Sequence, residues 1–306
     1  MQGFQKVVGH QEIITHLQNA ISMNKVSHAY LFGGESGSGK KMMASLFAMT
    51  LQCEKHGVEP CMECPSCKKA QSQNHPDIIY VKHEKPNTIS IDEIREQLIN
   101  DVMIKPYSSP YKIYIIDEAQ KLTLQAQNAL LKTIEEPPAY AVVMLLADNP
   151  DALLPTISSR CVQLNLKPVG DQLVKDYLMN EMHVPDYQAE VDASLAQGNI
   201  GKAERIARSP EYEETLENAL RMAKYADSMP LYEIVETIKK LTAEKDNIDD
   251  YFDIFSLWFR DVLLFKATKE VDSLVFKQEL NGIRERANKS LSLIHISEPT
   301  RHAQIS

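Results

Sequence analysis

The chain has 306 residues, enough for two or three domains, and its 43 % hydrophobic and 25 % charged residues are the balance of a soluble globular protein. No stretch approaches the ~18 uninterrupted apolar residues of a membrane span, and the N-terminus lacks the apolar core of a signal peptide, so we expect a cytoplasmic protein. A net charge of −9 argues against binding that depends mainly on phosphate contacts, although an acidic surface that serves solubility fits it equally well.

Apolar runs alternate with helical patterns through the first half of the chain. Helical spacing predicts helices over residues 10–23, 90–98 and 122–135, the second of which begins with a capping box of Ser90 and Glu93. Five short apolar runs between such segments predict the buried parallel strands of an α/β sheet. These runs occupy residues 28–33, 77–82, 112–117, 141–147 and 161–166.

Beyond residue 168 the strand pattern disappears. Short helices are expected over residues 170–207, with breaks near Pro185 and Gly198, and longer ones over 211–290, with breaks near Pro230 and residues 246–248. An aromatic stripe beside Trp258 predicts the core of a helical bundle, and it consists of Phe252, Phe255, Phe259 and Val262. Residues 291–306 have no helical period and resemble read-through from a cloning adaptor, so we expect a non-native tail there.

A phosphate-binding pattern, G-x-x-x-x-G-K, lies between the first predicted strand and a predicted helix. Backbone N–H groups of Gly34, Gly37 and Gly39 would converge on phosphate oxygens, and Lys40 would reach the terminal phosphates. The alternative, a glycine-rich turn with an incidental lysine, is disfavoured by the flanking strand and helix. Lys41 departs from the pattern, because a Ser or Thr hydroxyl should bind Mg²⁺ there, so we expect weakened binding of ATP and Mg²⁺.

Two carboxylates end the strand predicted at residues 112–117. In P-loop NTPases an Asp at the position of Asp117 holds Mg²⁺, and a Glu at the position of Glu118 polarises the attacking water. An Asp-Glu pair after a strand is by itself a weak sign of a nucleotide-hydrolysing site, but its place after the phosphate loop makes that interpretation stronger. The hydrolytic machinery is therefore expected to be damaged only in part.

A cluster of four cysteines predicts a structural Zn²⁺ site with no open coordination position. The pattern is C-x7-C-x2-C-x2-C, formed by Cys53, Cys61, Cys64 and Cys67. We expect it to hold an insertion over residues 53–67. A disulfide pair or a redox Cys-x2-Cys motif is the alternative. A nucleic-acid-binding zinc ribbon is disfavoured because few basic residues lie nearby.

Several motifs in this order closely resemble bacterial clamp-loader AAA+ subunits over residues 5–207 and more weakly beyond. They are the phosphate loop, the four-cysteine insertion, DEAQ at 117–120, NALLKTIEEPP at 128–138 and Ser-Arg-Cys at 159–161. Alone, Arg160 would be a surface ion-pair residue. The resemblance implies that it completes the ATP site of a neighbouring subunit as an arginine finger acting in trans.

The resemblance also implies three domains. They are an AAA+ P-loop core with a parallel sheet over residues 1–166, a small helical lid over 167–207 and an all-α collar for oligomerisation over 208–290. It further implies a five-subunit clamp loader with gamma or tau and delta, which opens the beta sliding clamp and places it on primed DNA during replication.

Two departures from the ATP-hydrolysing motor subunits of this family favour a non-motor subunit. Motor subunits carry Thr or Ser where Lys41 stands, and an arginine in the lid helix where Gly201 stands. One alternative is a motor that uses Lys40, Asp117 and Glu118. A weaker alternative is a DNA-binding zinc protein.

Overall fold

The computed structural model divides the chain into two compact units, one formed by Met1–Tyr177 and Gly198–Lys202 and the other by Leu178–Gln197 and Ala203–Ser306. The residues it describes are 3–225, 229–230, 232, 235–236, 239 and 248–289. The predicted non-native tail, residues 291–306, therefore lies outside the described part. Among the described helices, none has the length and apolar character needed to cross a membrane.

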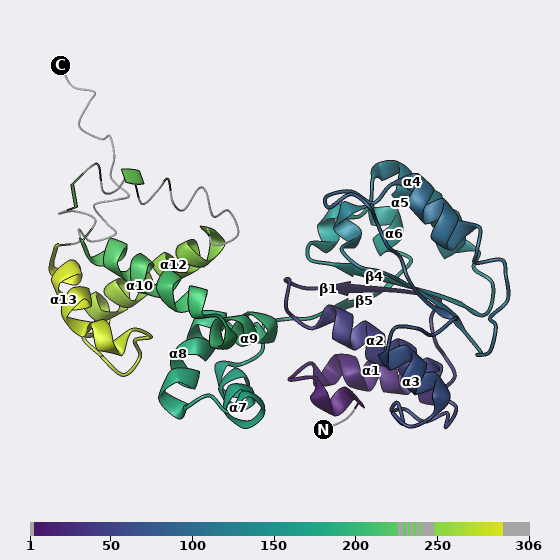
Figure 1. Ribbon diagram of the computed structural model, residues 1–306, viewed down its shortest axis with the longest axis horizontal. Helices are drawn as coiled ribbons and strands as arrows, with labels where there is room; N and C mark the ends of the chain where they lie inside the picture. The colour runs from purple at the N-terminus through teal and green to yellow at the C-terminus, as the bar shows by residue number, and fades with distance from the viewer. Residues whose placement is uncertain are drawn as a thin grey trace, which may run out of the picture. The chain divides into compact units, whose positions relative to one another are not determined.

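A five-stranded parallel sheet with the order β2-β3-β4-β1-β5 forms the centre of the first unit (Figure 1). The strands are β1 (Ala29–Gly33), β2 (Ile78–Tyr80), β3 (Lys112–Ile116), β4 (Ala141–Ala147) and β5 (Val162–Asn165). All five predicted strands are confirmed, because each apolar run is long enough to cross a sheet that is covered on both faces. The first strand along the chain lies between the fourth and the fifth.

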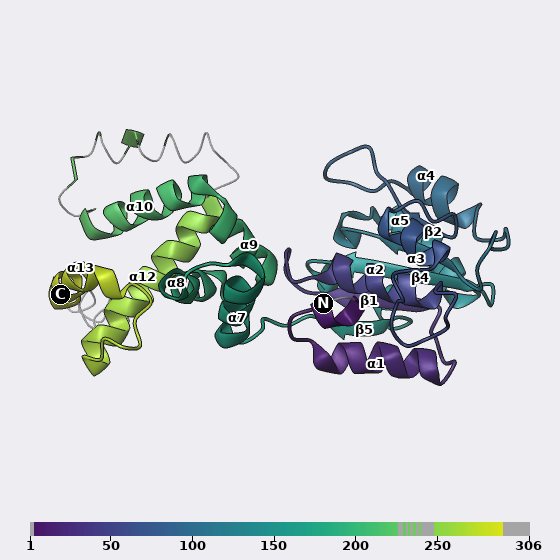
Figure 2. The same ribbon diagram turned by 60° about the horizontal axis from the view of Figure 1, so that its bottom comes forward.

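Helices cover both faces of the sheet (Figures 1 and 2). Successive side chains of a strand point to opposite faces, so β4 contributes Val142 and Met144 to one hydrophobic cluster and Val143 and Leu145 to the other. The first cluster is closed by α1 (Gln11–Ser22), α2 (Lys40–Leu51) and α3 (Pro65–Gln71). The second is closed by α4 (Ile91–Ile94), α5 (Leu124–Glu135) and α6 (Pro155–Ser158).

Side-chain caps determine where two of these helices begin. The predicted capping box of α4 is confirmed: Ser90 Oγ accepts from the N–H of Glu93 at 3.4 Å, and Glu93 Oε2 accepts from the N–H of Ser90 at 2.6 Å. Thr123 caps α5, which therefore starts two residues later than predicted. The remaining short elements are the π-helical η2 (Arg95–Ile99) and the 3₁₀ helices η1 (Gly3–Lys6), η3 (Ala119–Lys121), η4 (Pro150–Ala152) and η6 (Lys277–Glu279).

The chain beyond residue 168 is helical where the structure describes it. Its helices are α7 (Asp171–Met182), α8 (Asp186–Ala196), α9 (Ile200–Arg208), α10 (Pro210–Tyr225), α12 (Ile248–Thr268) and α13 (Leu280–Lys289). The breaks predicted near Pro185 and Gly198 are confirmed. Those predicted near Pro230 and residues 246–248 lie among or beside residues outside the described part. The three-domain division stays a prediction.

The stripe predicted as core on α12 is wrong for Phe252 and Phe259 and right for Val262, which is 1 % exposed. Phe252 and Phe259 are 63 % and 42 % exposed, whereas Trp258 is fully buried. Asp261 lies on the buried face because its carboxylate accepts hydrogen bonds from two N–H groups of residues 275–276 at 2.8 and 2.9 Å. This polar residue interrupts the apolar period of the buried face, which consists of Tyr251, Ile254, Trp258, Val262 and Phe265.

Candidate functional site

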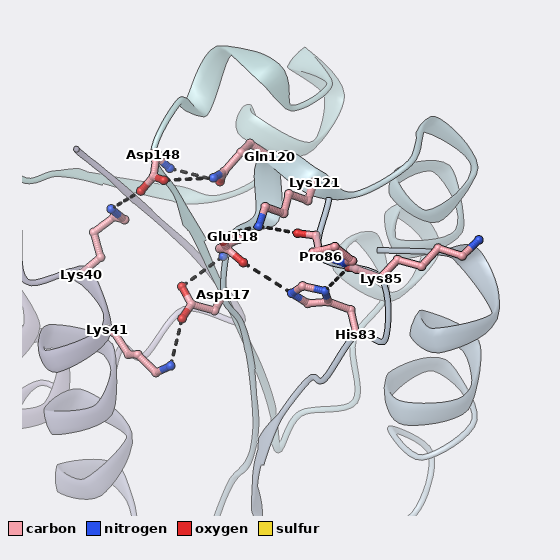
Figure 3. Close-up of polar contacts among 10 residues, drawn as sticks. All are labelled: Lys40, Lys41, His83, Lys85, Pro86, Asp117, Glu118, Gln120, Lys121 and Asp148. Carbon is pink, nitrogen blue, oxygen red and sulfur yellow. Dashed lines mark hydrogen bonds and ion pairs between the residues drawn. The ribbon is translucent and has the colours of Figure 1, made fainter. Parts of the chain in front are cut away.

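The carboxyl ends of three neighbouring strands place the predicted nucleotide-binding residues at one edge of the sheet (Figure 3). The phosphate loop follows β1, Asp117 follows β3, and Asp148 follows β4. Ligands of open α/β sheets bind outside these carboxyl ends. The fold therefore brings together residues that lie more than a hundred positions apart in the sequence.

The phosphate loop is covered by residues 199–201. Asn199 Nδ2 donates to the carbonyl of Ser36 at 2.7 Å, and the N–H of Gly201 donates to the carbonyl of Gly37 at 3.0 Å. Gly37 has a φ of 84°, and this position has no room for a side chain because a Cβ there would lie 2.6 Å from Asn199 Oδ1. The loop and the segment over it are consequently packed backbone against backbone.

This packing gives a physical meaning to the glycine at position 201. A Cβ on Gly201 would lie 2.7 Å from the Cα of Gly37 and 2.8 Å from its carbonyl oxygen. Backbone atoms cannot move aside as a flexible side chain can. An arginine at this position, as the motor subunits carry, therefore requires a different path for this segment.

Lys40 is bound entirely within the protein. Its side chain is 8 % exposed, and Nζ donates to the carbonyls of Gly34 and Glu35 at 2.7 and 2.8 Å and to Asp148 Oδ1 at 2.6 Å. An ammonium group has three donors, so a phosphate must replace one of these partners. Asp148 in turn exchanges two hydrogen bonds with the side-chain amide of Gln120 (Figure 3).

Sequence reasoning did not single out Asp148. The signal that could have found it is its position as the first polar residue after the buried strand β4, at the edge where ligands bind. Its partner Lys40 is 108 positions away, so no local pattern joins the two.

The carboxylates expected to act on Mg²⁺ and water are paired with cations. Lys41 Nζ lies 3.0 Å from Asp117 Oδ2. Glu118 lies 2.6 Å from Lys121 Nζ and 3.5 Å from Nε2 of His83, which makes a charge pair only when His83 is protonated. Lys41 and Asp117 are both well exposed, so their pair contributes only about 0–1 kcal/mol. Its effect is positional, because an ammonium stands where Asp117 would hold a metal ion.

Lys41→Thr is expected to bind Mg-ATP more tightly than the unsubstituted chain does, and to bind Mg-ATP more tightly than metal-free ATP. The substitution supplies a hydroxyl ligand and removes the cation beside Asp117. Lys41→Ala is the control, because it removes the cation without supplying a ligand. Isothermal titration of the three proteins with ATP, with and without Mg²⁺, tests the role of position 41, and equal affinities for Mg-ATP would contradict it.

The four cysteines form a group that could hold a metal ion. Their sulfur atoms all lie within 4.8 Å of one another, and Sγ of Cys61 is 3.9 Å from Sγ of Cys67. A tetrahedral Zn²⁺ site with Zn–S bonds of about 2.3 Å needs sulfur separations of about 3.8 Å, so the residues fit this ion. Backbone N–H groups of Cys64 and Glu63 lower the pKa of Cys61 to about 6, whereas burial raises the pKa of Cys67.

Arg160 lies after α6, far in sequence from the phosphate loop of its own chain, and its polar contacts are with Thr156, Ser159 and Glu135. Its Nη1 donates to the carbonyl of Thr156 at 2.9 Å, and its Nη2 lies 2.9 Å from Glu135 Oε1. Both side chains are close to half exposed, at 41 % and 45 %. The guanidinium is thus oriented by its own chain and still reachable from outside.

Comparison with known proteins identifies the family. A family model described as "DNA polymerase III, delta subunit" matches residues 9–170. The delta-prime subunit of DNA polymerase III from Bacillus subtilis is 31 % identical over 278 residues, which cover 90 % of this chain and 83 % of that subunit. The tau subunit of the same organism is 31 % identical over 303 residues, 92 % of this chain and 53 % of tau.

Among solved structures, a DNA polymerase III gamma subunit-related protein from Thermotoga maritima aligns at 19 % identity over 91 % of this chain and 94 % of its own, with a TM-score of 0.44. The chain thus spans most of a delta-prime subunit and about half of tau. Lys41 and Gly201, the two departures from the motor subunits, favour a non-motor member of the family. By its matching family model and these identities, the chain belongs to the DNA polymerase III clamp-loader subunits, the family of delta-prime, gamma and tau.

Proposed function

We propose that this chain is a non-motor, delta-prime-type subunit that assembles with gamma or tau and delta into a five-subunit clamp loader. The complex would open the beta sliding clamp and place it on primed DNA. The ion pair between Lys41 and Asp117 carries the non-motor assignment, because it places a lysine cation beside the carboxylate that would hold Mg²⁺. A nucleotide bound without its metal would lack the charge neutralisation on which phosphoryl transfer depends.

Two further contacts support a site that does not turn over ATP. Lys40 is engaged by Asp148 and two loop carbonyls, and Gly201 leaves the phosphate loop without the arginine that would read a γ-phosphate. The chain is proposed to bind ATP and Mg²⁺ with lower affinity than a motor subunit does. At least one partner of Lys40 must be displaced before a triphosphate can bind as it does in a motor subunit.

In this proposal the chain contributes to catalysis on another subunit through Arg160. A planar guanidinium can engage phosphate oxygens with two parallel hydrogen bonds and offset the charge that develops on the γ-phosphate. Its exposure and its separation from the chain's own phosphate loop support an action in trans. The cysteine cluster is proposed to hold one structural Zn²⁺ within the core unit.

The purified chain alone is expected to hydrolyse ATP negligibly, because Lys41 pairs with Asp117 and Gly201 stands where motor subunits carry the lid arginine. A coupled assay for ADP release, with saturating ATP and Mg²⁺, measures this. Turnover of about 1 s⁻¹ or more is an ordinary enzyme rate and would overturn the non-motor assignment.

A gamma- or tau-like motor is the second candidate. It is favoured by the retention of Lys40, Asp117 and Glu118 at the carboxyl ends of the strands. The same turnover assay separates the two, since a motor subunit supplies its own phosphate loop and metal site. Salt-dependent DNA binding by the isolated chain would instead support a DNA-binding zinc protein.

A further inference from the structure

Arg160 is held in place by an acidic residue from a different helix. Glu135 is the last residue of α5, and its Oε1 lies 2.9 Å from Nη2 of Arg160. The carbonyl of Thr156 accepts from Nη1 of the same guanidinium at 2.9 Å. Two neighbouring nitrogens of the guanidinium are thus engaged by different parts of the chain, and one of the two contacts is with a full negative charge.

The position of Glu135 is unfavourable for the helix that carries it. The C-terminal end of a helix carries partial negative charge and favours cations, yet α5 ends with Glu135 followed directly by Glu136. Pro137 and Pro138 then stop the helix, which leaves Glu135 in the last turn and Glu136 at the C-cap. A residue that breaks a local rule is expected to have a compensating role elsewhere. The contact that compensates is the ion pair of Glu135 with Arg160.

We infer that Glu135 is the positioning residue of Arg160, which orients the guanidinium toward the phosphate of the neighbouring subunit. This inference rests on the proposed function of Arg160. A guanidinium has five N–H donors. Nη1 donates to the carbonyl of Thr156 and Nη2 forms the ion pair with Glu135, so donors remain for a phosphate.

Holding the side chain before the partner arrives removes part of the rotamer entropy that binding would otherwise cost. Because the pair is well exposed, the contact itself is weak, and water or phosphate oxygens can reach the remaining donors. Glu135 thus acts on the geometry of Arg160 without burying its charge.

The test uses the clamp loader reconstituted from this chain, gamma or tau, and delta, with ATP hydrolysis measured in the presence of beta clamp and primed DNA. Glu135→Ala is expected to lower kcat by about 3- to 10-fold with little change in KM for ATP, because misplacing a group that acts in the transition state lowers kcat. Glu135→Gln keeps the length and one acceptor oxygen and should fall between Glu135→Ala and the unsubstituted chain. Glu136→Gln is the matched control, since it removes the adjacent carboxylate and should leave kcat unchanged.

A double substitution separates positioning from a general effect on the fold. If Glu135 acts only through Arg160, the variant carrying both Glu135→Ala and Arg160→Ala should have the kcat of Arg160→Ala alone. A further loss in the double variant, or a Glu135→Ala kcat equal to or above that of the unsubstituted chain, would overturn the inference. Should Glu135→Ala fail to assemble, Glu135→Gln carries the same comparison.

The two proposals fail in different ways. If Arg160→Ala itself retains full activity, the proposed role of Arg160 fails and Glu135 has nothing to position. If Arg160→Ala is impaired while Glu135→Ala and Glu135→Gln are not, the role of Arg160 stands and only the positioning role of Glu135 fails.

Discussion

Arg160→Ala is expected to leave this chain folded and able to assemble, while lowering ATP hydrolysis and clamp loading by the complex. The side chain is 41 % exposed, and truncation at such positions usually changes stability by less than about 0.5 kcal/mol. An arginine finger contributes about 10³–10⁵ in rate at the site that it serves. Only one of the ATP sites of the complex would lose its finger, so the steady-state loss is expected to be smaller than this range.

Single-turnover hydrolysis by the reconstituted complex resolves the affected site, which should appear as a slow phase. Arg95→Ala is the matched control, because Arg95 is also an exposed arginine that pairs with a carboxylate of its own chain, Asp92, and has no proposed role in trans. The isolated Arg160→Ala subunit should show no effect, since the target phosphate is on another chain. Unchanged hydrolysis and loading rates would leave Arg160 as the surface partner of Glu135.

The parts of the fold that were predictable from the sequence depend on local patterns. Three of the five strands, β1, β3 and β4, are apolar runs buried on both faces, and the loop from Gly34 to Lys40 carries its own glycines at positive φ. The cysteine cluster is local too, because Cys61, Cys64 and Cys67 lie within one short turn and helix start. Each of these features is specified by neighbours in the chain, so a single sequence reveals it.

The contacts that were missed join residues far apart in the chain. Asp148 reaches Lys40 across 108 positions, and Asn199 reaches Ser36 across 163. No spacing rule connects such pairs, and only the shared edge of the parallel sheet and the fold of the covering segment bring them together. The buried face of α12 was missed for a different reason. A charged residue such as Asp261 is expected on the surface, and the backbone N–H groups that satisfy its buried carboxylate belong to a loop 14 and 15 residues further along the chain.

These missed contacts change the account of the nucleotide site. From the sequence, Lys41 is the main damage to an otherwise ordinary phosphate loop. With the distant contacts included, Asp148 neutralises Lys40, and residues 199–201 occupy the space above Gly37. Restoring Thr at position 41 is therefore expected to improve metal binding without restoring turnover.

The purified chain is expected to contain one Zn²⁺, and Cys64→Ser should abolish most of its binding. Structural Zn²⁺ sites have apparent binding free energies of about 10–16 kcal/mol, so loss of one thiolate has a large effect on occupancy. Cys161→Ser is the control, because Cys161 is the cysteine outside the cluster and should leave the zinc content unchanged. Metal analysis of protein purified without chelator measures both, and a zinc-free unsubstituted chain would contradict the site.

How much of the fold loosens when Zn²⁺ is lost depends on where the cysteines pack. Cys53, Cys64 and Cys67 are buried in the hydrophobic cluster closed by α1, α2 and α3, on one face of the sheet. The cluster on the other face contains none of the four, so loss of the metal should loosen residues 53–67 and the adjoining α3 while the remainder of the fold persists. Hydrogen exchange should then rise around the cysteines and stay low in β4 and α5. Global unfolding on zinc removal would instead mean that the metal holds the whole core unit together, because the helix layer around the cysteines would then be required for the sheet to remain folded.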